Sequence, residues 1–179
     1  MKWSATSPAA QPILAADLRT HLRIDDSTQD AYLTTIIAAA VAHAEQVMQC
    51  SLIQRTITAT FYPGEHLALP RGPIISVASV TVDGDAQDAS TYELRGYGSL
   101  DLLYYRNMTT QPHAVPLIAV YSAGHGAAAA DVPADILQVI KCHAGLLYEN
   151  RETAADRAIM AVPFIEEFFR LRARGVQAG

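Results

Sequence analysis

The sequence has little cysteine, no long apolar run and no leader-like start. Its 179 residues include two cysteines, Cys50 and Cys142, which lie far apart in stretches that read as helix. A disulfide framework is not expected, since a chain of this length can bury roughly 70% of its unfolded surface without one. The apolar stretch from Ile36 to Ala44 is far shorter than the roughly 20 residues of a membrane-spanning helix. Because Met1-Lys2-Trp3-Ser4 also lacks the apolar run of a signal peptide, we expect a soluble protein made in the cytoplasm.

Basic and aromatic residues are also scarce. There are 13 lysines and arginines against 18 aspartates and glutamates, and the formal net charge is -5. This balance argues against a nucleic-acid binder that works by neutralising phosphates. Hydrophobic residues make up 50% of the chain but aromatic ones only 7%, and the difference is mostly alanine, valine, leucine and isoleucine. Alanine allows helices to approach closely.

Residues 14–50 have the pattern of helices. A short helix is predicted from Ala15 to Leu22, and a longer one runs to about Cys50. Two residue pairs could each cap the first turn of the longer helix reciprocally: Asp26 with Gln29, and Ser27 with Asp30. Its apolar residues recur at three- and four-residue steps and form one stripe: Leu33, Ile36, Ile37, Ala40, Val41, Ala44, Val47 and Met48.

After Ser51 the period changes from 3.6 to 2. Alternation over residues 56–61 predicts a strand, and the β-branched run at 74–82 predicts another that ends in the hairpin signal Asp83-Gly84. Further short strands are predicted at 92–94, 100–105 and 117–121. Together they predict a small antiparallel sheet or barrel inserted between helices.

Helical periodicity returns near residue 123. Asp131 with Pro133 is predicted to open a helix, since proline is tolerated in the first turn. The apolar stripe of this helix is Ile136, Leu137, Ile140, Ala144 and Leu147. After a weakly periodic stretch at 152–160, Pro163 is predicted to start a last amphipathic helix, which Gly175 ends.

The predicted fold class is therefore α+β, a helical body with an inserted antiparallel β domain. The expected boundaries are an extended N-terminal arm at 1–13, the helical body at 14–50, the β insertion at 51–122, the continued helical body at 123–152, and a C-terminal excursion with a docking helix at 153–179.

The histidines are the first place to look for catalysis or metal binding. None lies in a His-Glu-x-x-His pattern, and His43 and His143 fall on or beside helix stripes, where packing is the favoured interpretation. Cys142-His143 resembles half a zinc site, but a second pair at finger-like spacing is missing. No metal site and no cofactor are predicted.

One histidine has a more enzyme-like setting, because His125 lies between Gly124 and Gly126. Flexible backbone around a titratable ring occurs in active sites. The favoured alternative is a tight β-to-α turn in which both glycines adopt positive φ. Likewise, Asp83-Gly84-Asp85 lacks the later ligands of a calcium loop, and a hairpin tip explains it. No catalytic residue is predicted.

Several segments, weak alone, occur together in a specific order. They are Leu18–Asp25, Ala44-Glu45 in the long helix, Leu69-Pro70 with Pro73–Val77, Tyr121–Gly126, Val132–Ile136 and Tyr148–Glu152. The set runs through most of the chain and resembles the head-tail connector, or adaptor, proteins of long-tailed phages, the group described as gp6-like or phiE125 gp8-like.

The resemblance implies a non-catalytic ring subunit of the virion neck, commonly in twelve copies. Such a ring lies beneath the portal, contacts a stopper or tail-completion protein, and extends a channel through which DNA passes without sequence recognition. It implies portal docking by the C-terminal helix, carried here by Phe164, Ile165, Phe168, Phe169 and Arg172. We assign contacts between subunits to Tyr148, Glu149, Asn150, Arg151 and Glu152.

Two other classes of protein remain open from the sequence. A monomeric or dimeric assembly factor, acting like a chaperone, would share the fold without the ring. A small cytoplasmic hydrolase would need a pocket that places His125 near a carboxylate such as Asp131.

Overall fold

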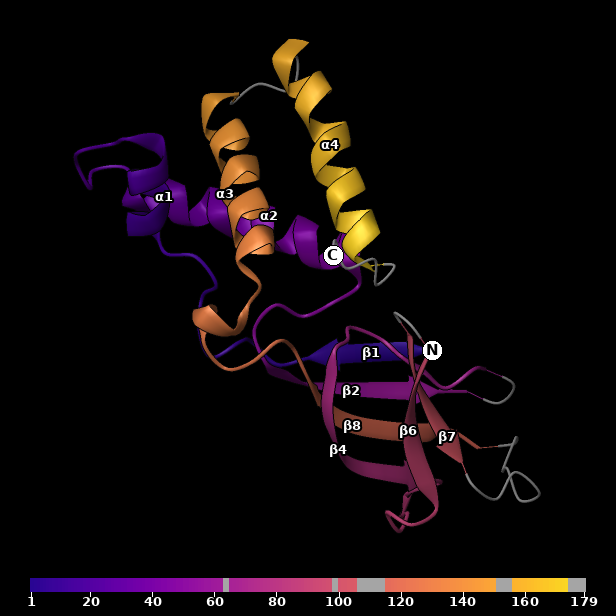
Figure 1. Ribbon diagram of the computed structural model, residues 1–179. Helices are drawn as coiled ribbons and strands as arrows, with labels where there is room; N and C mark the ends of the chain where they lie inside the picture. Colours follow the sequence, from indigo (N-terminus) through magenta and orange to yellow (C-terminus); the bar gives the residue numbers. More distant parts are fainter. Residues whose placement is uncertain (63–64, 98–99, 106–114, 151–155, 174–179) are drawn as a thin grey trace. The chain divides into compact units, whose positions relative to one another are not determined.

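The chain folds into two compact units, each assembled from segments distant in sequence. The computed structural model describes residues 1–62, 65–97, 100–105, 115–150 and 156–173 (Figure 1). One unit, here called the β unit, comprises Met1–Ala9 and Gln49–His125, and the other, the helical unit, comprises Ala10–Met48 and Gly126–Gly179. The chain therefore passes between the two units three times.

The elements confirm the predicted α+β class. The helices are α1 (Ala15–Leu22), α2 (Asp30–Met48), α3 (Ala134–Glu149) and α4 (Asp156–Ala173), and a 3-10 turn lies at Ala129–Asp131. The strands are β1 (Lys2–Ala5), β2 (Arg55–Phe61), β3 (Ala68–Leu69), β4 (Ile74–Val82), β5 (Asp85–Ala86), β6 (Tyr92–Tyr97), β7 (Leu100–Tyr105) and β8 (Leu117–Ala123).

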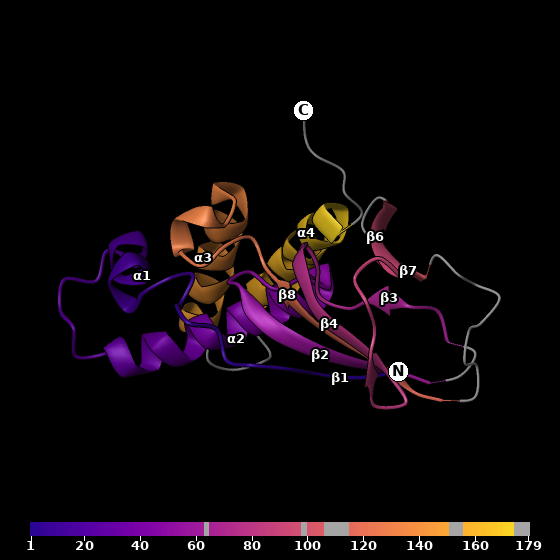
Figure 2. The same cartoon turned by 90° about the horizontal axis from the view of Figure 1, so that it is seen from below.

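The β unit contains two antiparallel sheets. The larger has the strand order β1-β2-β8-β4-β5, and the smaller has the order β3-β7-β6 (Figures 1 and 2). Alternate residues of β2 and β8 point to one face of the larger sheet, because successive side chains of a strand point to opposite faces. There they form a core with residues of β4 and of the smaller sheet: Ile57, Ala59, Phe61, Leu69, Val80, Leu103, Ala119, Tyr121 and Ala123.

The hairpin predicted at Asp83-Gly84 is present and joins β4 to β5. Asp83 has φ 54° and Gly84 has φ 87°, so both central residues adopt the left-handed conformation that two-residue hairpin turns favour. Earlier along β4 the pairing with β8 is irregular, with register shifts between Ile74 and Ser76 and between Val77 and Ser79. Strand β4 therefore carries β-bulges at these two places.

In the helical unit, α2 packs against α1, α3 and α4. Six of the eight residues in its predicted stripe are buried: Leu33, Ile36, Ile37, Ala40, Ala44 and Met48. The other two, Val41 and Val47, are half-buried. The buried residues of the other helices lie at matching three- and four-residue steps: Ile136, Ile140 and Ala144 in α3, and Ile165 and Phe169 in α4.

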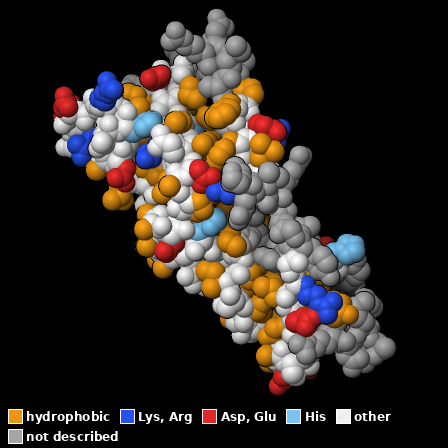
Figure 3. All heavy atoms as spheres, viewed as in Figure 1, with side chains coloured by type: hydrophobic (Ala, Val, Ile, Leu, Met, Phe, Trp, Pro, Cys, Tyr) orange, Lys and Arg blue, Asp and Glu red, His pale blue; other side chains and the backbone are white. Residues whose placement is uncertain are grey.

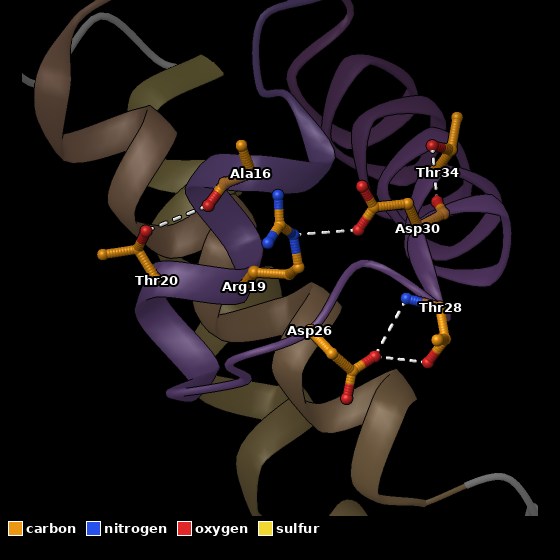
Figure 4. A network of polar contacts seen from close by, with 7 residues as sticks. All are labelled: Ala16, Arg19, Thr20, Asp26, Thr28, Asp30 and Thr34. Carbon is orange, nitrogen blue, oxygen red and sulfur yellow. Dashed lines mark hydrogen bonds and ion pairs between the residues drawn. The ribbon is translucent and has the colours of Figure 1, made fainter.

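The predicted reciprocal caps of α2 are not the contacts that form. The Asp26 carboxylate instead accepts hydrogen bonds from the backbone N–H and the hydroxyl of Thr28, which closes the turn before the helix (Figure 4). The carboxylate of Asp30 pairs with the Arg19 guanidinium of α1, with Nε 2.9 Å from Oδ1. The Asp30 carboxylate, which the sequence predicts as part of a cap, thus pairs with a residue of another helix.

The last helix starts earlier than the sequence predicted. Helix α4 begins at Asp156, so Pro163 lies inside it, and 156–160 are helical instead of an excursion. Between Asp156 and Pro163 the chain is mostly alanine, isoleucine, methionine and valine, which extend the helix backwards, and an aspartate suits a helix start. Residues 152–155 and Gly175, the predicted end of the helix, lie outside the described residues.

Candidate interaction surfaces

Helix α4 carries apolar residues on two faces, and the structure divides the predicted portal-docking residues between them. Ile165 and Phe169 are buried in the helical unit, whereas Phe164 is 70% exposed. Phe168 is half-buried, and its ring centroid lies 5.8 Å from that of Phe169. Leu171, which was not among the predicted residues, is 42% exposed and lies seven residues after Phe164, on the same side of the helix.

An ion pair joins α4 to α3. The Arg172 guanidinium lies 2.5 Å from the Asp135 carboxylate, between Nη2 and Oδ2. The hydrogen bond from Arg172 lowers the pKa of Asp135 below its usual value. Arg170 pairs with Glu166 one turn away on α4, at 2.8 Å. Arg172 therefore holds the helix in the chain's own fold.

Two histidines meet beneath α4. The rings of His43 (α2) and His143 (α3) lie 4.9 Å apart edge-on, and His43 is 6.3 Å from the ring of Phe169. Burial, and secondarily the neighbouring His43, lowers the pKa of His143. The prediction that both histidines serve packing agrees with this arrangement.

The block predicted to lie between subunits begins with residues used inside the helical unit. The Tyr148 hydroxyl donates a 3.1 Å hydrogen bond to Oε1 of Gln29, and its ring lies 6.1 Å from that of Tyr32. Asn150 donates from its backbone and its side chain to the carbonyl of Leu146. Glu149 is exposed on α3, while Arg151 and Glu152 lie outside the described residues.

The glycines flanking His125 differ in what they do. Gly124 has φ 140°, a conformation that L side chains rarely adopt, and its N–H donates to the carbonyl of Pro73. Gly126 does not have the positive φ that was predicted; instead, a Cβ there would lie 2.2 Å from the Asp131 carboxylate. That carboxylate accepts the backbone N–H of Ala128. Both glycines and Asp131 thus serve the turn.

The sequence prediction missed strand β1, which forms one edge of the larger sheet. The Arg71 guanidinium lies 5.1 Å from the centre of the Trp3 ring, and the amino terminus of Met1 pairs with Glu65. The alternation in Lys2-Trp3-Ser4-Ala5 is the only local signal, and four residues are too few for a period to be read. Its partner β2 lies more than fifty residues away.

Chemistry-bearing groups are dispersed in the part of the chain that the structure describes. There, no cluster of three or more His, Cys, Asp or Glu residues is placed to hold a metal ion. Neither Cys50 nor Cys142 forms a disulfide there. Over the same residues, no helix combines the length and the apolarity needed to cross a membrane. Hydrophobic side chains are visible at the surface of both units in Figure 3.

Over part of its length the chain is similar to a family of phage connectors. Residues 14–92 match the family described as "Phage gp6-like head-tail connector protein", which confirms the resemblance found in the sequence. The matched region runs from α1 through α2 and into the β unit as far as the start of β6. No curated protein sequence matches the chain.

Solved structures extend the likeness to the whole fold. A chain of the "Virion of native gene transfer agent (GTA) particle" is 22% identical, with a TM-score of 0.79, and the match covers 100% of this chain and 98% of that one. A chain of the "Neck of native GTA particle computed with C12 symmetry" is 21% identical, with a TM-score of 0.71 and the same coverage. Both units of this chain therefore have counterparts within a single chain of each solved structure.

Proposed function

We propose that the protein is a structural adaptor of a tailed phage or phage-like particle, forming a ring beneath the portal that joins the head to the stopper or tail. The observation that carries the proposal is the likeness over the entire chain to a subunit from a particle neck computed with C12 symmetry, combined with the connector-family match at residues 14–92. The ring is proposed to be a dodecamer that acts without catalysis or cofactor.

The outward side of α2 supports a ring contact. Its exposed residues carry no charge: Ala31, Thr34, Thr35, Ala38, Ala39, Ala42 and Gln46. The hydroxyls of Thr34 and Thr35 donate to the helix carbonyls of Asp30 and Ala31, so these polar groups are already paired within the helix. A ring uses two different faces of each subunit, and a small, uncharged helix face can bury closely against a neighbour. Tyr148, Glu149, Asn150, Arg151 and Glu152 remain proposed contacts between subunits.

Portal docking is proposed to use the outward side of α4. Ile165 and Phe169 anchor the helix in its own unit, and Arg172 is paired with Asp135, so the free apolar contact falls to Phe164 and Leu171, with Phe168 beside them. Exposed aromatic residues of this kind act as anchors in protein interfaces when a partner supplies a pocket. Of the five residues named from the resemblance, three hold α4 in its own unit, and two, Phe164 and Phe168, remain for contact with the portal.

The charge of the chain suits a channel through which DNA slides. With a net charge of -5 the subunit offers little of the lysine and arginine attraction that holds DNA phosphates. DNA is therefore proposed to pass without sequence recognition. A strongly basic channel lining in the assembled ring would remove this part of the proposal.

Electron microscopy of the protein mixed with the portal protein of the same phage tests the assembly. Ring-shaped density on the portal is expected, with a mass corresponding to about twelve copies. Complexes containing one or two copies and no ring would instead identify an assembly factor.

A matched pair of variants tests the docking face. Phe164→Ser is expected to weaken portal binding at least tenfold, because it removes an exposed aromatic anchor. Leu14→Ser alters another hydrophobic residue of the helical unit, 59% exposed, and is expected to bind as the wild type does. Equal losses in both variants would contradict docking through α4.

A further inference from the structure

Strand β1 is attached to the β unit in an unusual way. All four of its residues are exposed, and it contributes no side chain to the core. It is held in register against β2, from Lys2 opposite Thr60 to Ala5 opposite Ile57, and lies beside it at the sheet edge (Figures 1 and 2). The attachment rests mainly on backbone pairing, which any copy of β2 can supply.

The remaining contacts of this arm also go to the β unit. Thr6 donates its N–H to the carbonyl of Thr56 at 2.9 Å, and its hydroxyl accepts the N–H of Thr56. Together with the pairs formed by Trp3 and the amino terminus, these contacts all lie on residues 56–71. A second copy of the β unit presents the same set.

The connection between β1 and the helical unit has the character of a hinge. Pro12 and Ile13 are buried and fix the start of the helical unit, whereas Ser7 to Gln11 form no helix or strand. Those five residues can span roughly 17 Å when extended. Pro8 favours an extended course, because its ring fixes φ and disfavours helix in the residue before it. The arm can therefore leave its own unit without disturbing α1.

The two edges of the larger sheet differ in their fitness to receive a strand. The β4 edge is bulged at two places and is capped at one end by β5. The edge of β2 is regular over all four pairs with β1. Bulges discourage strand addition, and a regular edge accepts it. A displaced arm thus finds one specific acceptor on another copy.

We propose that in the assembled ring β1 pairs with β2 of the neighbouring copy, so that each subunit gives its arm to the next. The inference rests on the proposed ring. Exchange keeps every contact described above, and ring neighbours hold the acceptor at an effective concentration on the order of millimolar. Each subunit donates β1 to one neighbour and accepts β1 of the other neighbour on its own β2. In a closed ring, every β2 edge is therefore paired. In the free protein the arm pairs with its own β2.

A disulfide trap distinguishes the two pairings. In a background of Cys50→Ser and Cys142→Ser, the changes Ser4→Cys and Thr58→Cys place thiols directly opposite each other. Opposed residues in an antiparallel pair have Cα atoms about 4.5–5.5 Å apart, within the reach of a disulfide. Rings assembled on the portal are oxidised, denatured and run on a non-reducing gel. Covalent multimers are expected from rings, and internally linked monomers from the free protein.

A pair of cysteines that are not opposite each other controls for disulfides that form through random encounters between subunits. Ser79 lies in the same row as Ser4 but three strands away, since Thr58 and Ser79 both face Val120. Three strand spacings place Ser4 about 14 Å from Ser79, which is too far for a disulfide within the sheet. Ser4→Cys with Ser79→Cys is expected to yield no cross-linked product in rings.

The outcomes separate this inference from the proposed function. Rings seen by electron microscopy whose Ser4→Cys/Thr58→Cys chains migrate as internally linked monomers would overturn strand exchange and leave the adaptor intact. Equal multimer yields from the matched and mismatched pairs would also overturn it. The absence of rings would overturn both. A deletion of residues 2–5 adds a second measurement: the free chain should stay folded, and rings should dissociate at lower denaturant concentration than wild-type rings.

Discussion

The hydroxyl of Tyr121 donates a 2.5 Å hydrogen bond to the carbonyl oxygen of Pro70, linking β8 to the turn after β3. Tyr121 is fully buried, and burial raises the pKa of its hydroxyl, which therefore stays protonated and able to donate. The bond therefore connects a strand of the larger sheet to the turn that follows a strand of the smaller sheet.

Tyr121→Phe tests this link. The change keeps the ring in the core but leaves a part-buried carbonyl without its donor, which costs about 0.5–1.5 kcal/mol. Urea denaturation should show the lowered free energy of unfolding. Tyr62→Phe removes a hydroxyl from a ring that is 40% exposed and should change the stability by less than about 0.5 kcal/mol. Equal effects would contradict a structural role for the Tyr121 bond.

Asp135→Asn tests the ion pair that fixes α4. Because the pKa of Asp135 is lowered in the folded state, its contribution is present above the unfolded pKa and is lost as the pH falls through the folded pKa. The pair is partly exposed, so the loss at pH 7 should be only about 0.2–1 kcal/mol. The difference from the wild type should shrink as the pH falls below the unfolded value of about 3.9.

The control for Asp135 is Glu167→Gln, an exposed change on α4. Unfolding free energies measured at pH 7 should differ by less than about 0.5 kcal/mol between this variant and the wild type. A difference between Asp135→Asn and the wild type that persists unchanged at pH 3 would rule out the ion pair as its source.

His143 predicts a second pH dependence, in the opposite direction from a histidine with an acidic partner. Its pKa is lowered in the folded state, so between that pKa and the unfolded value of about 6.5 the unfolded chain binds more protons. Stability should therefore fall as the pH drops below about 6.5, by at most about 1.4 kcal/mol per pH unit. Denaturation at pH 7.5 and 5.5 should show a smaller pH effect in His143→Gln. Identical slopes would contradict this assignment.

Gly124 and Gly84 make a matched pair for the backbone. A Cβ at Gly124 would lie 2.6 Å from the amide nitrogen of Gln54, whereas at Gly84 it would meet nothing within 4 Å. Gly124→Ala should cost about 2–3 kcal/mol, because the backbone must move. Gly84→Ala should cost about 1 kcal/mol, from its positive φ alone. Thermal unfolding of both variants measures the contrast, and equal costs would contradict a close approach at Gly124.

Strong local periodicity made much of the fold predictable. The bounds of α1 and β4 match their predictions, and most of the predicted stripe of α2 is buried. In each of these the decisive signal lies within a few residues of the element. The hairpin at Asp83-Gly84 was predictable for the same reason.

Features set by distant contacts were not predictable. Asp30 pairs with Arg19 instead of capping its helix, and β1 exists only because β2 offers an edge. The sequence predicts a helix start at Pro163, whereas the helix continues through this residue. Periodicity in α4 identified apolar residues but could not tell Phe164, which is exposed, from Phe169, which is buried, because both faces of that helix are apolar.

The threefold passage of the chain between its units has a consequence for synthesis. The β unit is complete in sequence once His125 has emerged from the ribosome, whereas α1 and α2 must wait for Gly126 and beyond. A nascent chain can therefore finish its sheets first, while the apolar stripe of α2 stays uncovered until α3 is translated.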